Sequence, residues 1–119
     1  MFHGQDINTD LGNVKIHRNV IASIAALAAA EIDGVVRTGM PGLHGSFLKI
    51  TRQTSYGAIK VEFDKNEDVL IHIPLIVKFG FNIPDIAARI QENVRAQVEI
   101  MTNLSVKDIT ITVVAAERG

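Results

Sequence analysis

The segment from Val69 to Phe79 constrains the fold more than any other part of the sequence. All of its odd positions are apolar, whereas its even positions mix apolar, polar and charged residues. An alternation of period two predicts a β-strand that buries one face. Residues 59–63 alternate in the same way, and the polar residues 65–68 indicate a turn between the two segments. We therefore expect a β-hairpin, in which Pro74 marks an edge or a bulge because proline cannot donate a backbone hydrogen bond.

Two other segments carry apolar residues at helical spacing and can cover the apolar face of this hairpin. The first is predicted to run from Arg18 to Ile32, with Asn19 as its N-cap, and Gly34 is placed to end it. The second begins near Pro84, which a first helical turn tolerates, and Asn103 can end it in a left-handed turn. Its expected core stripe is Ile83, Ile86, Ala87, Ile90, Val94, Val98 and Met101.

The order of these elements indicates the fold class. Shorter strand patterns lie at Val14–Ile16, Val35–Val36, Leu48–Ile50 and Ile109–Val114. We predict an α+β fold, a two-layer sandwich with two helices packed on one face of a small, largely antiparallel β-sheet. Residues 1–11 are expected to be a mobile N-terminal tail, residues 12–115 a single domain, and residues 116–119 a short C-terminal tail.

Composition excludes several kinds of chemistry. The 119 residues contain no cysteine, which excludes disulfides, thiolate metal sites and cysteine nucleophiles. The four histidines lack the spacing of metal ligands, and His44 with Ser46 in a glycine-rich loop does not make a catalytic triad. No carboxylate pair or glycine-rich motif has the context of a catalytic or phosphate-binding site. The sequence therefore predicts no enzyme activity, no catalytic residue, no metal and no cofactor.

One stretch of the chain is locally basic. Residues 35–61 contain no acidic residue, although the whole chain has a net charge of −1. The basic residues of this candidate patch are Arg37, His44, Lys49, Arg52 and Lys60. Such a patch suits a partner protein, an anionic headgroup or a nucleic acid. Nucleic acid is not favoured, because the Gly42–Gly45 spacing of KH-type RNA-binding loops joins strand-like segments here rather than helices.

Spare apolar residues indicate self-association. Alanines occupy the first helix off its core stripe, and the long strand carries aliphatic residues on its second face. The candidate self-association surface consists of Ala22, Ala26, Ala29, Ala30, Leu70 and Ile76. Because monomers seldom expose large apolar patches, we expect a homo-oligomer.

Several linked motifs resemble a known family. Gly12-x-Val14-x-Ile16 leads into an alanine-rich helix, and Phe79-Gly80-x-Asn82-Ile83-Pro84-Asp85-Ile86-Ala87 is followed by Met101-Thr102-x-Leu104. Over residues 12–115 the chain resembles the bacterial alkaline-shock protein family, the Gls-type envelope stress response proteins. Two departures are Asn103, where glycine is expected, and the absence of the long charged tails of some members.

The resemblance implies a small, non-catalytic cytoplasmic protein of Gram-positive bacteria. It implies self-assembly and, for some members, a position beneath the membrane through a membrane-anchored protein partner, and it supplies no catalytic residues. The sequence itself has no apolar run long enough to span a membrane and no signal-peptide pattern, which predicts a cytoplasmic location. The leading interpretation is an envelope-stress scaffold, and the alternative is a regulatory module that binds nucleic acid or an anionic partner through the basic patch.

Overall fold

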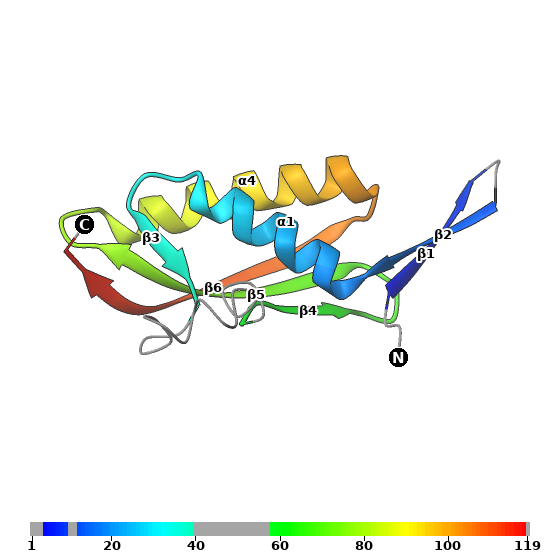
Figure 1. Ribbon diagram of the computed structural model, residues 1–119, viewed down its shortest axis with the longest axis horizontal. Helices are drawn as coiled ribbons and strands as arrows, with labels where there is room; N and C mark the ends of the chain where they lie inside the picture. The colour runs from blue at the N-terminus through cyan, green and yellow to red at the C-terminus, as the bar shows by residue number, and fades with distance from the viewer. Residues whose placement is uncertain (1–3, 10–11, 40–57, 119) are drawn as a thin grey trace, which may run out of the picture.

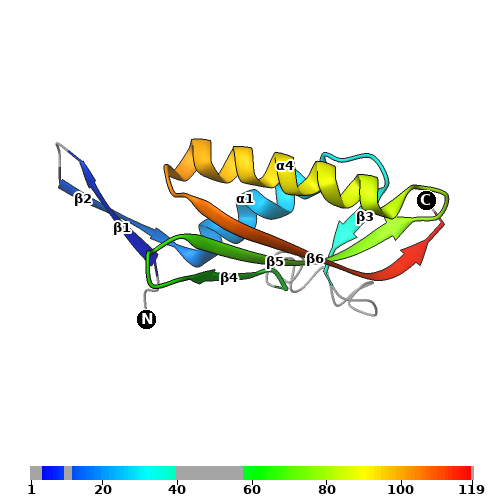
Figure 2. The ribbon, with the colours of Figure 1, turned by 180° about the vertical axis from the view of Figure 1, so that it is seen from behind.

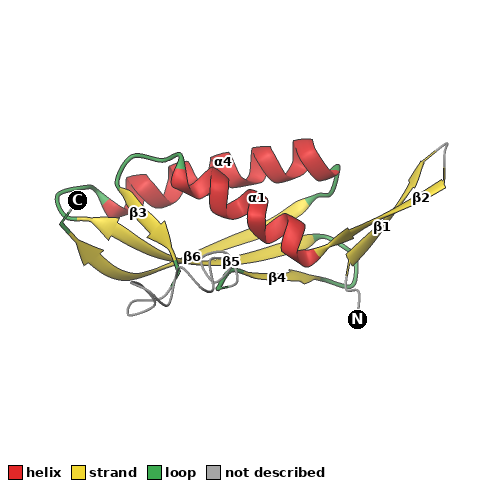
Figure 3. Ribbon diagram, viewed as in Figure 1, coloured by secondary structure: helices red, strands yellow, loops and turns green. Residues whose placement is uncertain are grey.

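The computed structural model describes residues 4–9, 12–39 and 58–118 (Figure 1). The elements of the described residues are β1 (Gly4–Thr9), β2 (Gly12–His17), α1 (Arg18–Ala30), β3 (Val35–Thr38), β4 (Lys60–Phe63), β5 (Val69–Lys78), α4 (Ile83–Thr102) and β6 (Val106–Glu117). Both helices lie on one side of a four-stranded sheet, and the β1–β2 hairpin projects away from it (Figure 3). The predicted two-layer α+β sandwich is confirmed.

β5 is the central strand of this sheet. β6 runs parallel to β5 along one side. On the other side, β3 pairs with the C-terminal part of β5 and β4 with its N-terminal part, both antiparallel. β3 and β4 therefore lie end to end along one edge. The expected antiparallel pairing holds for both of these strands, but β6 is parallel because α4 carries the chain back to the start of β5 before β6 begins.

Pro74 lies in β5, the central strand of the sheet. The expectation that it marks an edge strand is therefore wrong. The Gly39 N–H donates to the Pro74 carbonyl oxygen at 3.0 Å, so the backbone polar groups of residue 74 face the β3–β4 edge. β3 ends opposite Leu75, and β4 begins opposite His72. The missing N–H of proline thus falls in the interval between two strands, where it costs no ladder hydrogen bond. A register shift of β6 follows between Leu75 and Ile76.

α1 and α4 run antiparallel over one face of the sheet (Figures 1 and 2). Asn93 joins them, because its Nδ2 donates to the Ala28 carbonyl oxygen at 2.8 Å and to Glu31 Oε1 at 2.9 Å. Each aliphatic side chain buried between the layers stabilises the fold by about 1.5–3 kcal/mol. The core includes Ile21, Ala25, Ala28, Val61, Val69, Ile71, Ile73, Leu75, Val77, Ile86, Ile90, Val94, Val98 and Ile109.

The helix ends differ from expectation at one cap. Asn19 is not the N-cap of α1: His17 occupies that position, and its Nδ1 accepts a hydrogen bond from the Asn19 N–H at 3.0 Å. α4 is capped by Asn82, whose Oδ1 accepts from the Asp85 N–H at 3.0 Å. Asn103 ends α4 with a left-handed φ of 60°, as predicted.

The first residues of the described chain are a strand rather than a tail. Residues 4–9 form β1 and pair with β2 in register from Gly4 opposite His17 to Thr9 opposite Gly12. The predicted tail over residues 1–11 is therefore wrong for residues 4–9. At the other end β6 continues to Glu117, beyond the expected domain limit at residue 115.

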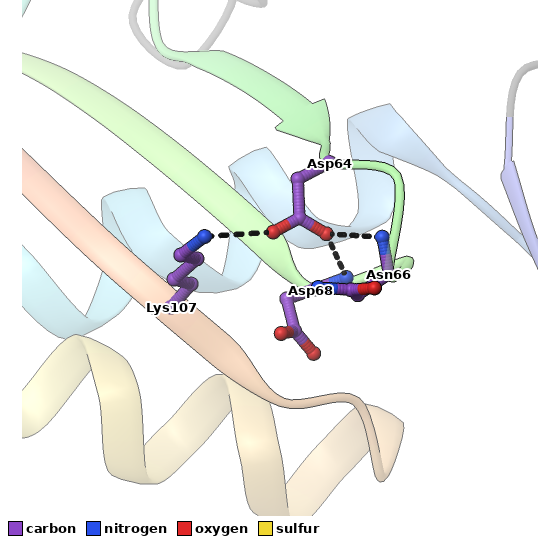
Figure 4. A network of polar contacts seen from close by, with 4 residues as sticks. All are labelled: Asp64, Asn66, Asp68 and Lys107. Carbon is purple, nitrogen blue, oxygen red and sulfur yellow. Dashed lines mark hydrogen bonds and ion pairs between the residues drawn. The ribbon is translucent and has the colours of Figure 1, made fainter.

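A polar network fixes the turn between β4 and β5 (Figure 4). Asp64 Oδ1 accepts from the backbone N–H groups of Asn66 and Asp68, both at 2.9 Å. Asp64 Oδ2 accepts from Lys107 Nζ at 3.2 Å. The Asp68 N–H, with Lys107 and the Asn66 N–H, holds the pKa of Asp64 below its ordinary value of 3.8, although desolvation opposes this. The turn is thereby tied to β6 and holds β4 in register.

Candidate interaction surfaces

Three members of the expected self-association surface are buried within the domain. Ala22, Ala29 and Ile76 are at most 4% exposed, so the expectation that they are free to meet a partner is wrong. Ala26 and Leu70 are half-buried, and Ala30 is exposed. The buried side of α1 is centred on Ala25 and faces the sheet. It therefore includes Ala22 and Ala29, which the sequence pattern placed outside the core.

Ile76 is buried although it lies on the face of β5 opposite the helices, since successive strand residues point to opposite faces. Arg37 stands opposite Ile76 on β3, and Glu117 stands opposite Lys78 on β6. The Arg37 guanidinium donates to both Glu117 carboxylate oxygens, at 3.4 and 3.2 Å. This ion pair crosses β5 beside Ile76.

The described residues do not gather a basic patch. His44, Lys49 and Arg52 lie outside the described residues. Arg37 is paired with Glu117, so its charge is compensated. Lys60 is exposed and stands opposite His72, four residues along β5 from the partner of Arg37, which is about 13 Å at strand spacing. The structure therefore adds no support for the nucleic-acid alternative.

Large apolar side chains are instead exposed on the outer side of the two helices. We call Val20 and Leu27 of α1 and Ile100 and Met101 of α4 the helix face; Leu27 is 68% exposed and Ile100 79% exposed. Val20 and Leu27 are seven residues apart and share one side of α1. None of the described elements covers this outer side (Figures 1 and 2).

Members of the helix face lie on both helices toward the same end of the layer, where α1 and α4 diverge (Figures 1 and 2). Val20 lies eight residues before Ala28, and Met101 lies eight residues after Asn93, which is bonded to Ala28. Because the helices are antiparallel, Val20 and Met101 lie in the same direction from that bond, each about 12 Å away. The core stripe predicted for α4 included Met101 and Ile83, but both are exposed. Ile83 precedes the first buried residue, Ile86, and Met101 lies beside the buried row, which ends with Val98 and Thr102.

A second exposed apolar group occupies the connection from β5 to α4. Phe79, Phe81 and Ile83 are all exposed there. Phe81 also covers Gly34, because a Cβ atom at Gly34 would lie 2.8 Å from Phe81 Cδ1. Sequence reasoning missed this group and the helix face, although both could have been found by asking which large apolar residues fall off the buried stripes.

The grooves of the described surface are shallow and mixed in polarity. A groove of about 550 Å³ lies between the helices beside Asn93, and one of about 360 Å³ runs along β4 beneath α1. A depression of about 160 Å³ lies on the open sheet face around His72. Within residues 4–9, 12–39 and 58–118, no three histidine or carboxylate side chains lie close enough together to hold a metal ion. No helix in this part of the chain is both long and apolar enough to cross a membrane.

Solved structures support the fold. A variant of MamM CTD described as a copper form is 17% identical, has a TM-score of 0.50, and covers 85% of this chain and 100% of that chain. Another MamM CTD variant is 16% identical with a TM-score of 0.51, covering 86% and 100%. At this identity the likeness concerns the fold alone.

Sequence relatives extend over almost the whole chain. The uncharacterized protein YqhY of Bacillus subtilis (strain 168) is 34% identical over 110 residues, 92% of this chain and 81% of that protein. The uncharacterized protein Spy1614 of Streptococcus pyogenes serotype M6 is 24% identical over 108 residues, 90% and 89% of the two chains. The model of the alkaline-shock protein 23 family, described by a "cell envelope-related function", matches residues 6–117, which confirms the resemblance to the alkaline-shock proteins drawn from the sequence motifs. The chain therefore belongs to the alkaline-shock protein family, whose function is related to the cell envelope.

Proposed function

We propose that this chain is a non-catalytic scaffold of the cell envelope that works by self-association through its helix face. The observation that carries the proposal is the exposure of Leu27 and Ile100 on adjoining helices that nothing described covers. A second copy is the occupant because the face is apolar on both helices, and an apolar surface is complementary to itself.

The size of the helix face determines how strongly two copies are expected to associate. Each of its large side chains gains about 1–2 kcal/mol when its exposed part is removed from water. Four residues from each of two copies thus contribute about 10 kcal/mol, similar to the association cost of about 4–15 kcal/mol. We therefore expect weak assembly that depends on protein concentration.

A non-catalytic role is part of the proposal. In the described ranges, the polar groups that interact serve caps, turns and interstrand pairs, as Asp64, Asn82 and Arg37 do. These three groups have structural partners, which supports a structural role for them. The proposal places the scaffold at the cytoplasmic side of the membrane with a membrane-anchored protein partner, in agreement with the envelope-related description of the family.

The test is the solution mass by light scattering over a concentration series. The wild-type chain should grow beyond the monomer as concentration rises, and Leu27→Glu or Ile100→Glu should weaken this growth, since each places a charge in an apolar contact. Thr110→Glu is the matched control, because Thr110 is exposed on the opposite face of the sheet. Unchanged assembly of both helix variants, or equal weakening by the control, would show that the helix face is not the contact.

A further inference from the structure

Among the described strands, β4 is an edge strand with one unpaired side. It pairs with β5 through Lys60–His72 to Phe63–Val69, and among the described residues no strand pairs with its other side. An unpaired strand edge is a template for pairing with another chain. The groove of about 360 Å³ runs along this edge, between residues 59–62 and the start of α1, so the described elements leave space beside it.

The backbone groups on the free side can be identified. The Asp64 N–H donates to the Asp68 carbonyl oxygen at 3.0 Å, so residues 60, 62 and 64 point their polar groups towards β5. The Val69 N–H donates to the Ser105 carbonyl oxygen at 2.8 Å, away from β4. Val69 stands opposite Phe63, so Phe63 and Val69 do not bond to each other through their backbones. The N–H and C=O groups of Ile59, Val61 and Phe63 therefore point to the free edge.

The side chains of β4 divide between the two faces. Ile59 and Val61 are buried towards the helices, and Phe63 packs beside them. Lys60 and Glu62 are exposed on the opposite face. A strand added at this edge must therefore be apolar at one set of alternate positions and charged at the other, as β4 itself is.

We infer that β4 pairs antiparallel with β4 of a second copy about a two-fold axis at Val61. In this register Val61 faces Val61 of the other copy, and Ile59 faces Phe63, so the outward backbone groups meet one another. Lys60 then stands opposite Glu62 of the second copy, twice by symmetry, in the close non-hydrogen-bonded positions. This inference rests on the proposed self-association and adds a second contact to it.

Charge selects this register over its neighbours. Because the outward backbone groups must meet, only slips of two residues keep the hydrogen bonds. One such slip places Lys60 opposite Lys60, and the other places Glu62 opposite Glu62. Like charges directly opposite each other destabilise a strand pair, so the register centred on Val61 is the favoured one.

α1 leaves room for the second copy. The residues of α1 that line the groove above β4 are Arg18, Asn19 and Ala22. On the same flank one turn further along lies Ala26, which is small and half-buried. Arg18 sits over the Phe63 ring at 5.8 Å, and its Nε atom is buried without a hydrogen-bond partner.

Charge reversal tests the inference in a Leu27→Glu background, where the helix face is disabled. Lys60→Glu and Glu62→Lys should each weaken dimerisation about tenfold, because each creates two like-charge pairs. The double variant Lys60→Glu/Glu62→Lys restores both pairs and should recover the dimer, as should an equal mixture of the two single variants. Lys65→Glu, in the exposed turn, is the matched control. The readout is the dissociation constant from light scattering.

Amide hydrogen exchange gives a second readout at the residues themselves. The N–H groups of Val61 and Phe63 should exchange more slowly as protein concentration rises, while that of the exposed Lys65 should not change. A Leu27→Glu parent that stays monomeric, single reversals without effect, or a double variant that fails to recover would each overturn the β4 contact. The helix-face proposal is judged separately, by the difference between wild type and Leu27→Glu.

Discussion

Gly34 shows how backbone conformation and packing combine at one residue. Its φ of +97° is strained for any residue with a side chain, and a Cβ atom there would lie 2.7 Å from Ile86 Cδ1. We expect Gly34→Ala to lower the free energy of unfolding by about 2–4 kcal/mol, from backbone strain and overpacking together. Urea denaturation monitored by circular dichroism measures this loss.

Gly80 provides the matched control for Gly34. Its φ is +93°, but nothing lies within 4 Å of a Cβ atom built on it. Gly80→Ala should therefore lose only the backbone term, about 1–2 kcal/mol. Equal losses in the two variants would show that Phe81 and Ile86 move aside and that packing against Gly34 contributes little.

Asp64 makes stability depend on pH in the acid range. Its pKa is lowered in the folded state, so its contribution is present above the unfolded value and is lost as pH falls through the folded value. The wild type should therefore be more stable than Asp64→Asn near neutral pH, and the difference should shrink as pH falls below 3.8. Urea unfolding at a series of pH values measures the difference.

Lys107→Gln separates the causes of that shift. The largest cause is the Asp68 N–H, so the pKa of Asp64 should rise in this variant but stay below its ordinary value. Carboxyl carbon NMR titration follows Asp64 directly. A return to the ordinary value would mean that Lys107, rather than the turn, controls the carboxylate.

Residue roles were predictable where the local backbone decides them. Asn103 adopts the left-handed turn expected from its position after the helical stripe. His17 replaces Asn19 as the cap because β2 runs directly into α1, and histidine is not among the usual cap residues. The ion pair between Arg37 and Glu117 beside Ile76 was not predictable, because it joins residues 80 positions apart in the sequence.

At the scale of elements, the start of α4 depends on its cap. Asn82 Oδ1 accepts the Asp85 N–H, and Pro84 occupies the first turn. Asn82→Ala should lower the free energy of unfolding by about 1 kcal/mol, whereas Asn82→Asp should keep most of it because a carboxylate also caps. Thermal and urea unfolding of the pair would contradict this role if both variants lost the same amount.

The elements that sequence reasoning found are those with a strong period. The β4–β5 hairpin and both helices were predicted because their apolar residues repeat at period 2 or 3.6. β1 was missed because Gln5, Asp6, Asn8 and Thr9 give it little apolar alternation, and its pairing with β2 is what makes it a strand. The parallel place of β6 follows from the crossover of α4, which depends on tertiary packing rather than on local pattern.

At the scale of the whole molecule, the layers were predictable but the contact surfaces were not. The sequence pattern tells which face of an element is apolar, and from this the two-layer fold follows. It does not tell how far α1 rotates towards the sheet, and this rotation buries Ala22 and Ala29 while Leu27 is left outside. The free edge of β4 also required the topology, because the sequence does not show that β5, rather than β4, is central.

The helix face and the β4 edge lie on different elements, so together they give each copy two different two-fold contacts. Two such contacts on one copy produce chains that continue to grow, whereas one alone stops at the dimer. We expect the wild-type mass to rise past the dimer with concentration. Leu27→Glu and Lys60→Glu should each form mainly dimers, and the combined variant should dimerise about tenfold more weakly than Leu27→Glu. Light scattering over one concentration series for the four proteins checks this. A wild type that stops at the dimer would mean that only one contact forms, and a single variant that is already a monomer would mean that the two contacts depend on each other.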